Sequence, residues 1–208
     1  IPPLEYRETY WHASEHYPDL AIKRGFNGAW YHNMEAKHGA DLRYYGFAHT
    51  LFSYVSPDEY FDTHPEYFSM VDGKRIRERT QLCLTNPEVL AITIAQLKED
   101  IKAHPEAKII SLSQNDCYFP CQCPECSRID KEEGSHAGTL LRFVNACADA
   151  IAEEYPDIII DTLAYHYTRQ APKITRPAPN VTVRLCTIEG CFSHPLEECQ
   201  AIAYPSDT

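Results

Sequence analysis

The stretch from Ile109 to Asp130 constrains the fold more than any other part of this 208-residue chain. It reads IISLSQNDCYFPCQCPECSRID, so a short apolar run of the kind that forms a buried strand passes into polar residues and then into four cysteines. In α/β folds, buried strands deliver polar groups at their carboxyl ends, where sites are built. The stretch therefore predicts a strand whose end carries functional side chains.

The rest of the chain alternates between strand-like and helix-like segments. We expect one helix from the Thr85 cap to about His104 and a second from about Thr139 to Tyr155, each with apolar residues on one face. These faces are Leu90, Ile94, Leu97 and Ile101 in the first helix, and Leu140, Val144, Cys147 and Ile151 in the second. The expected strands are 4–11, 26–31, 108–113, 157–167 and 181–188, together with one within 42–54 that ends near His49-Thr50. Such alternation indicates a parallel sheet.

Six strand units predict an α/β fold of the (β/α)8 TIM-barrel type that is incomplete, because such a barrel needs two more units. We expect a single domain over residues 1–208 that covers about the first six β/α units and is truncated at its carboxyl end. The alternative is an open doubly wound sheet. No G-x-G-x-x-G or G-x-x-x-x-G-K motif occurs, so a nucleotide-binding version of that sheet would lack its phosphate loop.

Composition and charge indicate which kinds of molecule the chain is expected to bind. The net charge of -11 argues against nucleic acid, because an acidic surface repels phosphate. No apolar run approaches the roughly 18 residues that cross a bilayer, so no membrane span is expected. The 14 tyrosines suit a carbohydrate partner, whose C–H faces stack on rings, although tyrosines also occur on ordinary surfaces. The compartment and the oligomeric state stay open, with a secreted or periplasmic location favoured over the cytoplasm.

Polar side chains follow several of the expected strands. If the strands are parallel, their carboxyl ends share one rim, which would bring Asp116 and Glu189 together. Two carboxyl groups on one rim are what glycoside hydrolysis requires, one as acid and one as base or nucleophile. Alternatively, Asp116 caps a turn and Glu189 pairs with Arg184. The substrate-binding candidates on the same rim are His49, Asn115, Tyr165, His166 and Tyr167.

The clustered cysteines Cys117, Cys121, Cys123 and Cys126 admit three interpretations. They could hold a structural zinc ion, for which C-x2-C is a common ligand hairpin. They could form disulfides with partners elsewhere, such as Cys191 or Cys199, or they could be free thiols. No cofactor is required for the expected catalysis, so zinc would be structural. Structural zinc sites usually draw their ligands from separated parts of the sequence, which counts against four ligands from one short loop.

The turn at Asp72-Gly73 predicts a hairpin, because this dipeptide supplies the positive φ that such a turn needs. Four basic residues follow it: Lys74, Arg75, Arg77 and Arg79. They form either a solvated loop or an arm that binds a carboxylate. In the second case, Arg75 or Arg77 would meet the carboxylate of a substrate.

Six segments carry a resemblance to a known family. They are PPLEYRETY, HTLFSYVSPDEYFDTHPEYF, DGKRIRERTQLCLTNPEV, SQNDCYFPCQCPEC, FVNACADAIAEEYPD and LAYHYT. In these the chain resembles an uncharacterised bacterial family, domain of unknown function 4838. That family is grouped with TIM-barrel glycoside hydrolases and is often found behind a domain similar to the N-terminal domain of alpha-glucuronidases. The resemblance implies a (β/α)8 barrel that acts on carbohydrate, and it transfers no catalytic pair.

Together these observations predict part of a carbohydrate-active barrel that hydrolyses a glycosidic bond, with a bond next to a uronic acid as one candidate. Under this hypothesis Asp116 is the acid or base and Glu189 is its partner. The alternatives are a non-catalytic carbohydrate-binding barrel and a metal-stabilised structural domain built on the loop from Cys117 to Cys126.

Overall fold

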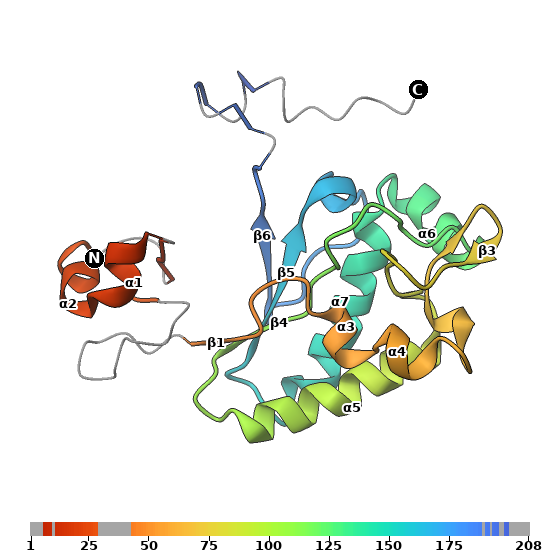
Figure 1. The fold of residues 1–208 in the computed structure, drawn as a ribbon, viewed down its shortest axis with the longest axis horizontal. Helices are drawn as coiled ribbons and strands as arrows, with labels where there is room; N and C mark the ends of the chain where they lie inside the picture. The colour runs from red at the N-terminus through yellow and green to blue at the C-terminus, as the bar shows by residue number, and fades with distance from the viewer. Residues whose placement is uncertain are drawn as a thin grey trace.

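The chain forms a mixed α/β fold around a four-stranded parallel sheet (Figure 1). The computed structural model describes residues 6–9, 11–28, 43–188, 190, 191, 193–195, 198 and 199. Within these residues, the strands of the sheet are β1 (Tyr44–Tyr45), β4 (Ile109–Ser111), β5 (Ile159–Ala164) and β6 (Val181–Leu185), in that spatial order. The central register places Ile110 opposite Ile160 and Ile160 opposite Val181. The predicted parallel sheet is thus confirmed for these four strands.

Two long helices cover one face of the sheet (Figure 1). They are α5 (Pro87–Ala103) and α7 (Ala137–Ala152), which pack against each other, and α7 also contacts β5 and β6. The shorter helices are α1 (His12–His16), α2 (Pro18–Lys23), α3 (Leu51–Tyr54), α4 (Pro57–Tyr60) and α6 (Pro124–Glu133), with 3-10 turns at Pro65–Tyr67 and His166–Thr168. No helix of the described residues is long and apolar enough to cross a membrane.

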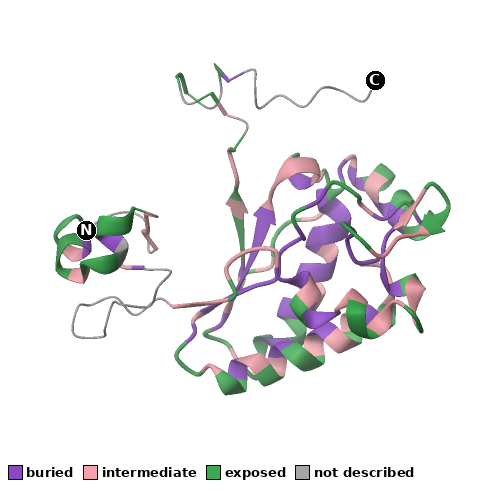
Figure 2. Ribbon diagram, in the orientation of Figure 1, coloured by how far each residue is buried: buried purple, intermediate pink, exposed green. Residues whose placement is uncertain are grey.

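The core lies between this face of the sheet and the two helices, where buried residues concentrate (Figure 2). Ile110 and Ile160 enter it from the strands, and Val144 and Cys147 enter it from α7. Because side chains alternate along a strand, the neighbours Ser111 and Asp161 belong to the other face. Cys147 is fully buried, as its place on the predicted apolar face of α7 indicated, and burial raises the pKa of its thiol to about 12.

Helix α5 begins one residue later than its sequence predicts. Asn86, not Thr85, is the N-cap, and its side chain accepts hydrogen bonds from the N–H groups of Glu88 and Val89. The most deeply buried positions of α5 are Val89, Thr93, Leu97 and Ile101, while Leu90 and Ile94 are only partly buried. The predicted helix is therefore confirmed, and its buried face is rotated toward Thr93.

A buried carboxylate fixes α6 against α7 and the segment before β6. Glu133 is fully buried and accepts hydrogen bonds from Arg142 of α7 at 2.6 Å and from the N–H groups of Ile174 and Thr175 at 2.9 and 3.0 Å. Burial alone would raise its pKa, but the bonds from Thr175, Ile174 and Arg142 outweigh it and hold the pKa of Glu133 at about 2.

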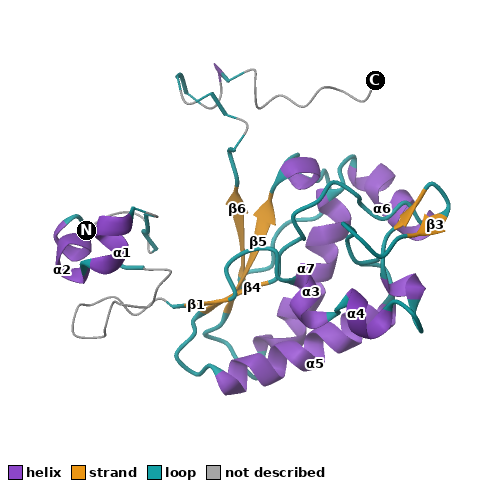
Figure 3. Cartoon of the chain, in the orientation of Figure 1, coloured by secondary structure: helices purple, strands orange, loops and turns teal. Residues whose placement is uncertain are grey.

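The strands predicted in the N-terminal part of the chain are absent or shorter in the described residues, unlike the central strands (Figure 3). Residues 6–9 and 26–28, the described parts of the first two expected strands, have no strand structure, and the remainder lies outside the described residues or beside α1. The third expected strand, within 42–54 and ending near His49-Thr50, is shorter in the structure: β1 covers only Tyr44–Tyr45, and α3 begins at Leu51. The hairpin at Asp72-Gly73 is confirmed: β2 (Met70–Val71) pairs antiparallel with β3 (Lys74–Arg75), and both turn residues have positive φ.

Candidate functional site

The loop after β4 leaves the carboxyl edge of the sheet and is anchored by buried polar groups. The side-chain oxygen of Gln81 accepts a bond from the N–H of Asn115 at 2.9 Å, and its amide donates to the Asn115 carbonyl at 2.8 Å. The side-chain amide of Asn115 donates to the Thr80 carbonyl at 3.2 Å. Because all three residues are buried, losing a partner would leave a polar atom unpaired, at a cost of about 1–3 kcal/mol. The loop is therefore fixed where it leaves the strand.

Gln114 connects this loop to the neighbouring strand end. Its side-chain amide donates to the carbonyl of Tyr165 at 3.1 Å, and its oxygen accepts from the hydroxyl of Thr168. The ring of His49, from the segment after β1, donates through Nδ1 to the Gln114 carbonyl at 2.8 Å. Three segments that follow β1, β4 and β5 thus meet at one edge, as expected for parallel strands.

Four side chains at this edge form an accessible group, which we call the rim network: Asp116, Tyr118, Tyr165 and His166. The Tyr165 hydroxyl donates to Oδ1 of Asp116 at 2.9 Å, and the Tyr118 hydroxyl lies 2.8 Å from Nδ1 of His166. The His166 ring also contacts both phenol rings, with centroid distances of 4.3 Å to Tyr118 and 3.7 Å to Tyr165. Asp116 and Tyr118 are exposed. The network offers a carboxylate and aromatic surfaces side by side.

The other predicted site residues have different places. His49 lies beside the network, 5.5 Å from Tyr165 between ring centroids. Asn115 is buried, and its amide is engaged by the loop anchor rather than presented at the surface. Tyr167 packs edge-on against His136, with the ring centroids 5.8 Å apart. Glu189 lies outside the described residues.

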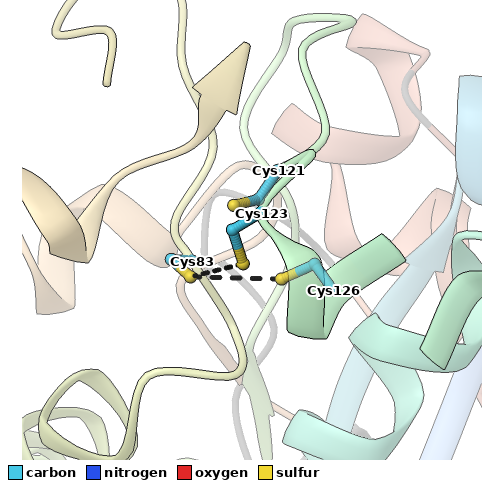
Figure 4. A group of neighbouring side chains, drawn as sticks. All are labelled: Cys83, Cys121, Cys123 and Cys126. Carbon is cyan, nitrogen blue, oxygen red and sulfur yellow. Dashed lines mark hydrogen bonds between the residues drawn. The ribbon is translucent and has the colours of Figure 1, made fainter. Parts of the chain in front are cut away.

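Four cysteines gather in a buried group, which we call the cysteine group: Cys83, Cys121, Cys123 and Cys126 (Figure 4). Their sulfur atoms all lie within 4.8 Å of one another, and the Cys83 sulfur is 3.6 Å from that of Cys123 and 4.0 Å from that of Cys126. Tetrahedral zinc with Zn–S bonds of about 2.3 Å requires sulfur atoms about 3.8 Å apart. A disulfide would require about 2.05 Å, and none of the nine cysteines is in one. The residues present thus fit a four-thiolate metal site.

The elements that carry these cysteines explain how the group forms. Cys123 is the N-cap of α6 and Cys126 lies in its first turn, where the helix dipole favours thiolates. Cys121 is held against the hairpin, because its sulfur accepts from the N–H of Met70 at 3.4 Å. Cys83 comes from the segment before α5, where the Phe68–Leu82 bridge aligns the chain.

Charge around the group favours anionic sulfur. Arg75 lies 3.6 Å from the sulfur of Cys121 and also donates to the Phe68 carbonyl at 2.6 Å. Hydrogen bonds from Cys121 and Cys126 lower the pKa of Cys83, so that one thiolate is shared among neighbouring thiols. The contact of Arg75 with the Cys121 sulfur is of the outer-shell kind that orients metal ligands. Arg75 therefore faces the cysteine group.

The other arginine that the sequence suggested as a partner for a substrate carboxylate has partners within the chain. Arg77 pairs with Asp58 and Asp62 at 3.0 and 3.2 Å. These ion pairs join the segment after the hairpin to α4 and the turn that follows it.

The structure brings together a set of four cysteines that differs at one position from the expected ligand set. Cys117 does not belong to the group: its sulfur donates to the Thr80 carbonyl at 3.3 Å and accepts from the Gln81 amide at 3.2 Å, within the loop anchor. Cys83 completes the set instead. The sequence signal that could have found it is the tendency of zinc ligands to come from two separated segments.

Comparison of the sequence with known protein families identifies the family of this chain. A family model, Domain of unknown function (DUF4838), matches residues 1–208. The chain belongs to the DUF4838 family. No curated protein matches it significantly.

In this DUF4838 chain, one loop carries two kinds of chemistry. Between β4 and α6, Asp116 and Tyr118 are exposed, whereas Cys121 and Cys123 are buried against Cys83. The exposed side can contact a ligand through a carboxylate and aromatic rings, and the buried side can bind a metal ion. A metal bound there would stabilise the loop that presents the rim network.

Proposed function

We propose that this chain forms part of the wall of a carbohydrate-active (β/α)8 barrel, a glycoside hydrolase with its sugar site at the rim network. The order of the described parallel strands supports this, because β4, β5 and β6 are neighbours in both sequence and space. The placement of α5 and α7 on one face also supports it, since the helices of a barrel lie outside its strands. A doubly wound sheet has helices on both faces.

The observation that carries the proposal is the pairing of Asp116 with Tyr165 beside the exposed ring of Tyr118. Sugars present C–H faces to aromatic rings and hydroxyl groups to carboxylates, and the rim network offers both. Under this proposal Asp116 is the acid or base at the glycosidic oxygen, and Glu189 supplies the second carboxyl group. A sugar-binding barrel without turnover is the alternative for the same surface.

Binding of oligosaccharides, neutral and uronic acid-containing, tests the sugar site. We expect the Tyr118→Ala variant to bind at least about tenfold more weakly than the unaltered chain, because a ring that stacks on the ligand is lost. Tyr17→Ala is the matched control, since Tyr17 is 61% exposed, close to the 57% of Tyr118, but belongs to the N-terminal segment. Equal binding by both variants, or no binding of any glycan, would remove the sugar site from the rim network.

We further propose that the cysteine group holds a structural zinc ion. The four buried sulfur atoms at tetrahedral spacing support this second role. Such an ion would tie the segment before α5 to the rim loop, and its binding energy would contribute directly to folding. Elemental analysis of protein purified under reducing conditions should find zinc, and its removal by a chelator should lower the thermal midpoint. A metal-free chain of unchanged stability would contradict this role.

A further inference from the structure

A second group of metal-binding side chains lies after β6. Cys191, His194 and Cys199 bring their ligand atoms within 4.8 Å of one another. The sulfur of Cys191 is 3.6 Å from Nε2 of His194, 3.2 Å from its Nδ1, and 3.9 Å from the sulfur of Cys199. The three residues occur in the pattern C-x2-H-x4-C, and none of them belongs to the cysteine group.

The spacing of these atoms agrees with tetrahedral coordination of one ion. In a tetrahedral site, bonds of about 2.3 Å to sulfur and about 2.0 Å to nitrogen place sulfur and nitrogen ligands about 3.5 Å apart, and two sulfur ligands about 3.8 Å apart. The observed 3.6 Å to Nε2 and 3.9 Å between sulfurs match these values. A disulfide between Cys191 and Cys199 would need sulfurs about 2.05 Å apart.

Two hydrogen bonds join described residues of this segment. The Ser193 hydroxyl donates to the Cys191 carbonyl at 3.3 Å, and the N–H of Glu198 donates to the Pro195 carbonyl at 3.0 Å. Cys199 is buried, whereas Cys191 and His194 are exposed, so the group is open on one side.

We propose that Cys191, His194 and Cys199 form a second metal site, which takes zinc or a divalent cation of similar softness. Two thiolates and an imidazole are ligands that zinc prefers, and three protein ligands leave one coordination position for water or another donor. This site differs from the closed four-thiolate site proposed for the cysteine group. It also lies past the carboxyl end of β6, the end of the sheet from which the rim loops leave.

Titration of the reduced full chain with cobalt(II) tests this site, because cobalt occupies zinc sites and thiolate ligation gives it a charge-transfer absorption. We expect His194→Ala and Cys191→Ser each to bind one ion fewer than the unaltered chain, while the stronger four-thiolate absorption remains. Cys123→Ser should show the reverse, losing the four-thiolate absorption and retaining the two-thiolate one. His16→Ala and Cys186→Ser are matched controls outside both groups and should change neither signal.

The outcomes separate the two sites. Loss of the only bound ion in His194→Ala would support the second site and overturn zinc in the cysteine group. An unchanged stoichiometry and spectrum in both His194→Ala and Cys191→Ser, each shown by circular dichroism to be folded, would overturn the second site. Free thiols can also be counted in denatured protein that has not been reduced. If the unaltered chain had fewer free thiols than Cys191→Ser, Cys191 and Cys199 would form a disulfide, and the second site would be overturned.

Discussion

The sulfur of Cys83 lies 3.6 Å from the sulfur of Cys123, although 40 residues separate them in the sequence. This contact joins the segment before α5 to the N-terminus of α6. The rim loop runs between β4 and α6, so its far end is fixed by the same contact. Occupation of the cysteine group by a metal would therefore stabilise the surface that carries Asp116 and Tyr118.

Replacement of Cys83 by serine should release the metal. A hydroxyl is a poor zinc ligand, so we expect Cys83→Ser to contain about one zinc ion fewer than the unaltered chain. Its thermal midpoint should fall toward that of the chelator-treated unaltered chain, because zinc binding contributes to folding. Elemental analysis and thermal unfolding of the same samples check both statements.

Cys117→Ser is the matched control for this prediction. Serine can donate the same hydrogen bond to the Thr80 carbonyl that the Cys117 thiol donates at 3.3 Å. Its zinc content should therefore equal that of the unaltered chain. A loss of zinc in Cys117→Ser together with full retention in Cys83→Ser would restore the ligand set that the sequence alone predicted.

Sequence patterns predicted the helices best where the apolar residues repeat at helical spacing and are all buried. All four residues of the expected face of α7 are buried, because their spacing matches the helical repeat. In α5 the true cap is Asn86, which local spacing could not distinguish from Thr85, since both residue types are good caps. Leu97 and Ile101 of the expected face are buried, but Val89 and Thr93 are the other buried positions in place of Leu90 and Ile94, which are only partly buried.

Helix α6 and Cys83 show what sequence patterns could not provide. The buried face of α6 consists of Cys126, Ile129 and Glu133, so a thiol and a carboxylate take positions where apolar residues are expected. Glu133 is accommodated only because Arg142 and the 173–175 segment supply its partners, which depends on tertiary structure. The addition of Cys83 to the cysteine group likewise depends on a contact across the fold.

Under the proposed function, Asp116→Asn should abolish glycoside hydrolysis without unfolding the chain. The residue is exposed, and the amide oxygen of asparagine can still accept the bond from the Tyr165 hydroxyl. An amide cannot transfer the proton, so we expect at least about a 100-fold loss in the rate of glycosidic cleavage. Asp157→Asn, exposed before the amino end of β5, is the matched control and should be as active as the unaltered chain. Unchanged activity of Asp116→Asn would exclude Asp116 from the mechanism.

Glu133→Gln should destabilise the fold. A neutral amide at this position cannot pair with the Arg142 guanidinium as a carboxylate does, and it leaves a cation poorly compensated. We expect the free energy of unfolding to fall by roughly 3 kcal/mol, measured by urea denaturation near neutral pH. The folded-state pKa of Glu133 is lowered to about 2, so its contribution is present above the unfolded pKa of about 4.3 and is lost as the pH falls toward 2.

Glu132→Gln provides the control for that variant. Glu132 is partly exposed and contacts Arg128 and Arg142 at 3.2 and 3.4 Å, so its loss should change stability by less than about 1 kcal/mol. If Glu133→Gln were no less stable than Glu132→Gln, the buried carboxylate would not be the anchor between α6 and α7.

Asp161 should make the free energy of unfolding fall as the pH rises, opposite to the effect of Glu133. It lies on the face of the sheet away from α5 and α7, and burial raises its pKa to about 6, although Arg184 at 2.7 Å and the Tyr44 hydroxyl at 3.4 Å favour its charged form. A folded-state pKa above the unfolded value of about 3.9 means that the folded chain binds this proton more tightly. Its stabilising contribution is therefore complete below about pH 3.9 and is lost as the pH rises through 6.

The difference in unfolding free energy between the unaltered chain and Asp161→Asn isolates this effect from other carboxylates. Relative to the variant, which does not titrate there, we expect the unaltered chain to lose roughly 2 kcal/mol between about pH 4 and pH 7. Urea denaturation of both proteins across that range measures the change. A difference that grows in favour of the unaltered chain as the pH rises would mean that the ion pair with Arg184 outweighs burial, and that the pKa of Asp161 is lowered instead.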